Sequence, residues 1–201
     1  MLLNSCGSLK QYSAEYKIGL HSVESPEDVK KQFGDTKIVD ISENGGSKYQ
    51  YEDDFIKIKW WVSAYEFNFE LTNKTKHALK INWDDISYVD IRGNAGRVMH
   101  KGIKYIDRNE SQAPTTVPRG ATISDILIPT ENVYFLKGAY GGWRTKTLFP
   151  FLYNSKAELN AAAGAYIGQK MTILMPIKIE DTTNEYNFVF NVDEWVNAPA
   201  K

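Results

Sequence analysis

The chain has 201 residues, of which 42% are hydrophobic, and its 24 lysines and arginines nearly balance 25 acidic residues, for a formal net charge of −1. This composition supplies enough apolar material for a packed core, and the charge balance argues against a nucleic-acid-binding domain, which is normally basic. The single cysteine excludes a disulfide framework within the chain, and three histidines leave little material for a metal site, so we expect no bound metal and no cofactor.

The first residues carry a short motif around the cysteine. Leu3-Asn4-Ser5-Cys6 consists of an apolar residue, two intervening residues and a cysteine, and the second intervening residue is small. This run resembles the lipobox of bacterial lipoproteins, in which the cysteine sulfur receives a diacylglyceryl group. The resemblance implies that Cys6 is lipidated and anchors the chain in a membrane. Gly7 after the cysteine would fit sorting to the outer membrane, with the domain in the cell envelope and facing the periplasm.

The segment before the motif is short. Only five residues precede Cys6, whereas a secretory signal contains an apolar region of roughly 7–15 residues. Either the start lies further upstream, or the sequence was cut just before the lipobox, or the match is chance and Cys6 is an unmodified terminal cysteine. We interpret residues 1–17 as a truncated signal, lipobox and polar tether, and residues 18–201 as a single β-sandwich domain.

A helix and a hairpin are predicted next along the chain. Ser25 as N-cap, Pro26 at the first helical position and Gly34 past the end indicate a short helix. Lys37–Ile41 and Lys48–Glu52 then indicate two strands joined by a glycine-containing turn.

Strict alternation in the middle of the chain is the strongest β signal. In Phe55–Val62, Glu66–Leu71 and Leu79–Trp83, apolar residues alternate with charged or amide side chains, except that Trp61 occupies the lysine face of the first run. Such alternation puts one face of a strand on a core and the other in water, as in an antiparallel sheet. Shorter strands are expected at Ser87–Ile91, Arg97–His100, Thr122–Ile128 and Val133–Leu136.

The C-terminal part predicts a second helix and a long hairpin. Ser155 and Glu158 form a capping box ahead of an alanine-rich run of about two turns. Met171–Ile179 and Tyr186–Val192 indicate the two strands of the hairpin, and Pro176 places the first of them at a sheet edge or at a bulge.

The sequence predicts about nine or ten strands and two short helices, with no helices between successive strands. This order of elements favours a mainly β, antiparallel sandwich. Phe67–Thr75 with Leu79–Trp83 after it, and later Val117–Thr122, resemble segments of immunoglobulin-like domains in bacterial envelope lipoproteins. The resemblance covers roughly residues 55–195 and implies an immunoglobulin-like β-sandwich, but such sandwiches host many roles. We expect the core to hold the aromatic residues of the apolar faces: Trp60, Phe67, Phe69, Trp83, Phe188 and Phe190.

Two segments are locally basic. Residues 92–108 contain five cations and one anion, and residues 137–146 contain three cations and no anion. If they meet in space, they form a basic patch for an anionic partner such as a lipid, an acidic glycan or an envelope protein. The alternative is two separate solvated loops. The candidate binding residues of the first segment are Arg97, Lys101, Lys104 and Arg108.

The second basic segment is also rich in glycine and aromatic residues. Gly138–Arg144 contains Tyr140, Trp143 and Arg144, and its glycines allow the backbone to present both rings at a surface. Exposed aromatic rings beside a guanidinium can stack on sugars or form a protein hot spot. The alternative is that the rings fold back onto the edge of the sheet.

No catalytic constellation is recognisable. His21, His77 and His100 are far apart in sequence and lie in no known nucleophile motif. The carboxylate clusters at Glu52–Asp54 and Asp84–Asp85 lack the spacing of a calcium loop. We therefore expect a non-enzymatic lipoprotein that acts as a binding or assembly module of the cell envelope. The alternative is a carbohydrate-binding or adhesin-type module that uses the aromatic loop, and a hydrolytic enzyme ranks third.

Overall fold

The computed structural model describes residues 12–24, 36–43 and 46–198. Cys6, the helix predicted from Ser25 to Gly34 and the first two residues of the predicted turn at 44–46 lie outside these residues. The described residues contain one α-helix, α1 (Lys156–Gly164), and fifteen strands: β1 (Tyr12–Glu24), β2 (Lys37–Asp40), β3 (Tyr49–Glu52), β4 (Ile56–Val62), β5 (Phe67–Asn73), β6 (Leu79–Ile81), β7 (Ser87–Val89), β8 (Ala95–Met99), β9 (Thr115–Val117), β10 (Thr122–Pro129), β11 (Val133–Leu136), β12 (Gly142–Thr145), β13 (Leu152–Tyr153), β14 (Lys170–Ile179) and β15 (Thr182–Ala198).

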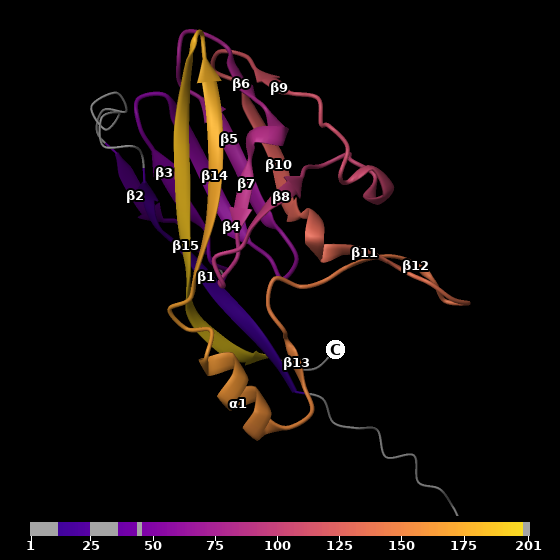
Figure 1. The fold of residues 1–201 in the computed structure, drawn as a ribbon. Coiled ribbons are helices and arrows are strands. Elements are labelled where there is room, and N and C mark those ends of the chain that lie inside the picture. The colour runs from indigo at the N-terminus through magenta and orange to yellow at the C-terminus, as the bar shows by residue number, and fades with distance from the viewer. Residues whose placement is uncertain (1–11, 25–35, 44–45, 199–201) are drawn as a thin grey trace, which may run out of the picture.

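Thirteen strands form one continuous sheet. Its order is β13-β1-β15-β14-β7-β8-β10-β5-β4-β3-β2. In addition, β6 pairs with β14 and β9 pairs with β6, while β11 and β12 form a separate two-stranded sheet. The long sheet curls so that β14 and β15 lie across β3, β4 and β5 (Figure 1). The mainly β, antiparallel class predicted from alternation is confirmed, in the form of a curled half-barrel. The strand number expected from the sequence was too low, and the immunoglobulin-like sandwich stays a prediction.

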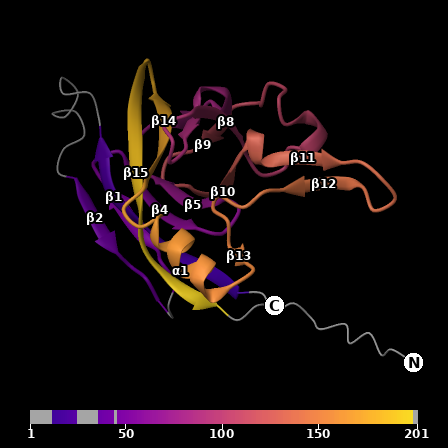
Figure 2. The same cartoon turned by 60° about the horizontal axis from the view of Figure 1, so that its bottom comes forward.

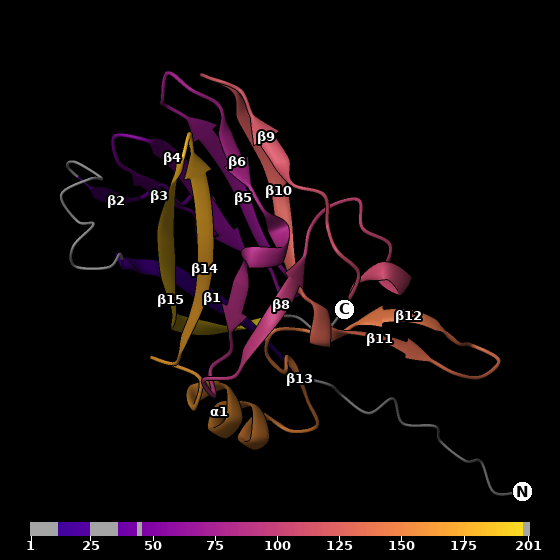
Figure 3. The same ribbon diagram turned by 45° about the horizontal axis from the view of Figure 1, so that its top comes forward.

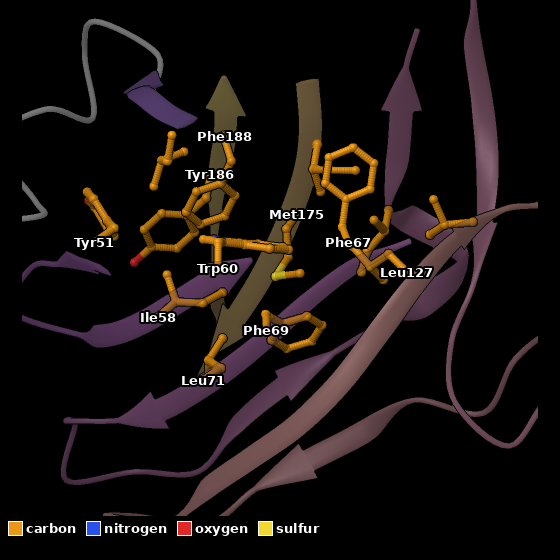
Figure 4. Close-up of a cluster of buried hydrophobic side chains, with 14 of the residues drawn as sticks. Tyr51, Ile58, Trp60, Phe67, Phe69, Leu71, Leu127, Met175, Tyr186 and Phe188 are labelled. Carbon is orange, nitrogen blue, oxygen red and sulfur yellow. The ribbon is translucent and has the colours of Figure 1, made fainter. Parts of the chain in front are cut away.

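The core lies between the two halves of the curled sheet. The aromatic residues predicted to form it are buried, and Trp60 of β4 contacts Phe188 of β15 with ring centroids 5.0 Å apart and Phe69 of β5 at 5.1 Å. Figure 4 shows Met175, Tyr186 and Phe188 facing the side chains of β4 and β5. Each fully buried large apolar side chain contributes about 1.5–3 kcal/mol to stability.

Strand β1 was not predicted. Tyr12–Lys17, interpreted as part of a polar tether, forms the first half of this strand and pairs with the end of β15. The pairing register shifts between Lys17 and Ile18 and again between Leu20 and Ser22. These irregularities interrupt the alternation of apolar and polar residues, which explains why the sequence pattern did not indicate a strand.

Pro176 does not lie at a sheet edge. Strand β14 pairs with β15 along its whole length, and on its other side it pairs with β7 up to Leu174 and with β6 from Ile177. Pro176 falls in the gap between these two short partners. The missing backbone N–H is thus accommodated inside the sheet, because β6 and β7 leave this position without a ladder partner on that side.

The predicted second helix is confirmed. The Ser155 hydroxyl accepts a hydrogen bond from the Glu158 N–H at 3.1 Å, and the Glu158 carboxylate accepts one from the Asn154 N–H at 3.0 Å. Leu159 and Ala163 pack the helix against the beginning of β1 and against β13. Figure 1 shows α1 at the lower end of the sheet, and in Figure 2 β13 lies between α1 and the β11–β12 hairpin.

Candidate functional site

The β11–β12 hairpin stands apart from the main sheet. Within the described residues its strands pair only with each other, from Val133 opposite Thr145 to Leu136 opposite Gly142. Figures 1 and 3 show it extending away from the body of the molecule. The reversal requires glycine, because a Cβ at Gly141 would lie 2.6 Å from the Leu136 carbonyl oxygen and Gly142 has a φ of 139°. An isolated two-stranded hairpin is only marginally stable in water, so anchoring at its base is needed.

Aromatic and apolar contacts supply that anchor. Val133 is buried with Met99 and Ile128. The Trp143 ring meets the Tyr105 ring edge-on with centroids 6.5 Å apart, and the Thr145 hydroxyl donates a hydrogen bond to the Tyr105 hydroxyl at 3.1 Å. Trp143 thus holds the hairpin against the 3₁₀ turn Tyr105–Asp107 and is not presented to solvent as a free platform.

The distal half of the hairpin is apolar and exposed. Tyr140 at the tip has 91% of its surface exposed, Phe135 53% and Leu136 47%, and Tyr134 is also exposed. Phe135 touches the edge of the Trp143 ring at a centroid distance of 5.4 Å, which leaves its other side uncovered. Large apolar side chains gathered on one projection are a sign of an interaction site.

Cations surround these apolar side chains. The Arg108 guanidinium lies 4.9 Å from the centroid of Trp143, and the Lys146 ammonium lies 5.6 Å from that of Tyr134. Arg144 donates hydrogen bonds to the carbonyl oxygens of Trp143 and Tyr140, so its side chain is folded along the reversal. Arg108 therefore joins the first basic segment to the second at the base of the hairpin.

Arg97 lies elsewhere and has a different environment. Its guanidinium donates to Asp84 at 2.8 Å and to the Asn109 carbonyl oxygen at 2.7 Å. The Ser111 hydroxyl, the Gln112 N–H and Arg97 together hold the pKa of Asp84 below its ordinary value. This arrangement ties the loop before β9 to the segment between β6 and β7 and occupies the guanidinium that the sequence suggested for an anionic partner.

The other three cations of the first segment, Arg92, Lys101 and Lys104, do not lie together. Lys101 is exposed and follows His100, and Lys104 directly precedes the 3₁₀ turn at the base of the hairpin. Arg92 instead lines a cleft together with Lys146, but Asp90 and Glu131 line the same cleft, so that surface has mixed charge. Among the described residues the two basic segments thus meet at two places: at the base of the hairpin through Arg108 and Trp143, and along this cleft, which Arg97 also lines.

A groove runs between the base of the hairpin and the β4–β5 turn. Its lining includes Tyr65, Tyr105, Trp143 and Arg144, with Glu66 as the acidic member. Burial raises the pKa of Glu66. The groove combines aromatic surface with one cation and one carboxyl group, a combination that can bind a polar ring such as a sugar.

Each of the three histidines contacts a different carboxylate. The His100 ring stacks on Trp83 with centroids 4.0 Å apart, and its Nδ1 lies 3.2 Å from the Asp125 carboxylate. His21 contacts Asp193 and His77 contacts Glu180. In the described part of the chain, no group of three or more histidine, cysteine or acidic residues has a geometry that could hold a metal ion.

The exposed pair Phe135 and Leu136 was missed as a candidate site. The run Val133–Leu136 was interpreted only as one of the shorter strands. The signal that could have identified it is the absence of alternation: four successive apolar residues put apolar side chains on both faces, as expected for a strand that is buried on both sides or used for binding.

No protein-family model matches the chain, and no significant match is found among curated proteins. The X-ray structure of Northeast Structural Genomics Consortium target SoR45 is 10% identical in sequence, with 94% of this chain and 87% of that chain aligned, at a TM-score of 0.26. A TM-score this low supports no conclusion about fold or function. Within the described residues, no helix is long and apolar enough to cross a membrane.

Proposed function

We propose that this chain is a non-catalytic binding or assembly module of the bacterial cell envelope, and that it binds an anionic partner through the β11–β12 hairpin. The observation that carries this proposal is the position of Phe135, Leu136 and Tyr140: they are exposed on a projection whose strands pair with no other strand in the described chain. The core does not require them. Residues 137–146 add three cations and no carboxylate to the same projection, which favours an anionic partner.

The envelope location rests on the N-terminal motif. In this proposal Cys6 is lipidated and anchors an immunoglobulin-like domain in the outer membrane, facing the periplasm. Stable anchoring by lipid needs two or more acyl chains, which bacterial lipoproteins carry on the cysteine. The intact mass of the protein, expressed from its native gene and taken from the membrane fraction, tests this part. A mass that starts at Cys6 with added acyl chains is expected, and an unmodified chain outside the membrane fraction would overturn the lipid anchor.

Site-specific photo-crosslinking tests the hairpin. A photoreactive amino acid replaces Tyr140 in one protein and Ile167, which is exposed between α1 and β14, in a matched control. Irradiation of the bacterial envelope should give an adduct with a lipid, a glycan or a protein from position 140 and none from position 167. Equal yields at both positions, or no adduct at position 140, would contradict binding through the hairpin.

A carbohydrate-binding module is the second candidate function, and the groove beside the hairpin favours it. Tyr65, Tyr105 and Trp143 line this groove, and Arg144 can donate hydrogen bonds to hydroxyl or carboxylate groups. Titration of an acidic-glycan panel should then change the tryptophan fluorescence. Tyr65→Ala should abolish the response, because it removes one of the rings that line the groove. Tyr65 is exposed, so its removal leaves Trp143 in place as the fluorescent reporter. A panel without any response would count against this function.

A further inference from the structure

The apolar side chains of the hairpin lie on both of its faces. Neighbouring residues of a strand point to opposite sides, so Phe135 is on the face of its partner Trp143, and Leu136 is on the other face. Tyr140 adds a ring at the tip that is 91% exposed. A rigid partner that docks against one face would leave the apolar side chain of the opposite face in water.

We infer that the tip of the β11–β12 hairpin inserts into the interfacial region of an anionic lipid bilayer. This inference rests on the proposed function and names the partner of the same site. A fluid medium surrounds an inserted projection and can contact Phe135, Leu136 and Tyr140 at the same time. Tyrosine is also one of the residues that prefer the boundary between lipid headgroups and acyl chains.

The charges on the hairpin match a lipid surface with anionic headgroups. Lys137 directly follows Leu136, and Arg144 lies opposite Tyr134, so both cations belong to the projection that carries the apolar residues. Lys146 lies closer to the base, against the Tyr134 ring. Long basic side chains can keep their stems beside acyl chains while the charged ends reach the phosphates.

The backbone limits how deep the hairpin inserts. Within the described chain, the outer edges of β11 and β12 pair with no further strand, so they carry N–H and C=O groups that need hydrogen-bond partners. Water is absent from the hydrocarbon core, and each unsatisfied group there costs several kcal/mol. Insertion is therefore confined to the headgroup boundary, about 5–10 Å deep, where water and phosphate oxygens remain.

Vesicle binding tests the inference with the full chain carrying Cys6→Ser, which removes the acyl anchor. The vesicles contain phosphatidylethanolamine with phosphatidylglycerol, and phosphatidylcholine vesicles serve as the neutral reference. We expect binding to the anionic vesicles that weakens with salt. Lys137→Gln should weaken it about fivefold, the effect of about one basic charge near such a surface.

A matched pair of double variants distinguishes binding through the hairpin from nonspecific binding through exposed apolar side chains elsewhere. Phe135→Ser with Leu136→Ser removes two side chains that are 53% and 47% exposed, and Leu152→Ser with Ile167→Ser removes two that are 45% and 50% exposed elsewhere. The hairpin pair should weaken vesicle binding by roughly tenfold or more, whereas the control pair should stay within about twofold. Equal losses in the two pairs would overturn the inference.

A second variant covers the case in which the hairpin pair disturbs the packing of Trp143. Tyr140→Cys in the Cys6→Ser background carries an environment-sensitive dye at a position that is almost fully exposed. Its emission should shift to the blue with anionic vesicles, and the same dye at Ile167→Cys should not respond. No shift at position 140 would overturn the inference.

The outcomes also separate this inference from the proposed function. If the protein binds neither kind of vesicle while the crosslinker at position 140 captures an envelope protein or glycan, lipid insertion is wrong and the proposed binding function stands. If the crosslinker also captures nothing, both are wrong.

Discussion

The β14–β15 and β11–β12 hairpins contain similar residues and use them in opposite ways. On β14–β15, the inward side chains of Ile173, Tyr186 and Phe188 have no exposed surface and close the core. On β11–β12, Phe135 and Leu136 remain about half exposed. Apolar side chains stabilise a fold only to the extent that folding removes them from water. The first hairpin therefore closes the core, and the second carries the surface at which we propose binding.

Truncation of the core hairpin should have the largest effect. Phe188→Ala removes a ring that lies 5.0 Å from Trp60 and 5.9 Å from Tyr51, measured between centroids. The cavity and the lost burial should lower the free energy of unfolding by about 3–5 kcal/mol, as measured by urea denaturation. Phe135→Ala, the same substitution on the exposed hairpin, should cost less than about 1 kcal/mol. Similar losses in both variants would remove the distinction between the hairpins.

A buried carboxyl group beneath β15 should give the next largest effect. The Asp53 carboxylate accepts hydrogen bonds from the N–H groups of Phe55 and Ile56 at 2.8 and 2.7 Å and from the Tyr51 hydroxyl at 3.0 Å. Asp53→Ala would leave these donors without that acceptor in a site that is 1% exposed. We expect a loss of about 2–3 kcal/mol at neutral pH, measured by urea denaturation with Asp54→Ala as the neighbouring control. An equal loss in the control would contradict the role of the carboxylate.

The same group should make stability depend on pH. Burial raises the pKa of Asp53, and the hydrogen bonds from Ile56 and Phe55 only partly oppose this. The folded chain therefore holds this proton more tightly than the unfolded chain, whose value is about 3.9. The contribution of Asp53 to stability is fully present below that value and falls as the pH rises to the folded pKa.

Asp53→Asn isolates this contribution, because it keeps the shape of the side chain and cannot ionise. The difference in unfolding free energy, variant minus wild type, should increase from pH 4 upward and then level off. Urea denaturation at a series of pH values measures it, and titrations of other groups cancel in the difference. A difference that is flat or that decreases with pH would contradict a raised pKa.

Removing the anchor of the exposed hairpin should have a smaller effect on stability, confined to the hairpin. Trp143→Ala removes the ring that contacts Tyr105, Phe135 and the Arg108 guanidinium. Amide hydrogen exchange in β11 and β12 should accelerate by roughly tenfold, equivalent to about 1.4 kcal/mol, with no change in β4 and β5. A uniform acceleration throughout the sheet would mean that the hairpin is part of the main cooperative unit.

The contrast between the hairpins also marks what the sequence predicts. Strands β4, β5 and β6 were predicted because one face of each packs on the core, which imposes alternation on the sequence. Strands β1 and β12 were missed: bulges interrupt β1, and in the part of the chain that the structure describes Gly142–Thr145 pairs with β11 alone. The pairing of β1 with β15 joins the two ends of the described chain, and no local pattern encodes such a long-range partner.

The candidate site was predictable to a similar, partial extent. Glycine and aromatic residues identified the reversal, and Tyr140 does stand in solvent. Composition did not indicate that Trp143 serves as the anchor, because its packing against Tyr105 and Arg108 depends on a segment some 35 residues earlier in the chain. Composition also did not indicate that Arg97 forms an ion pair with Asp84. Side-chain partners from distant segments decide which cations and rings remain available.

The smallest effect on stability should come from the residues to which the proposal assigns binding. Leu136→Ser and Tyr140→Ser each remove an apolar side chain that water already reaches, so the free energy of unfolding should change by no more than about 0.5 kcal/mol. Leu71→Ser in β5, where the side chain has no exposed surface, is the matched control and should strongly destabilise the fold. Urea denaturation of the three variants measures this contrast directly. A loss of several kcal/mol in the hairpin variants would mean that these residues hold the fold together, and their exposure would then no longer be evidence for a binding surface.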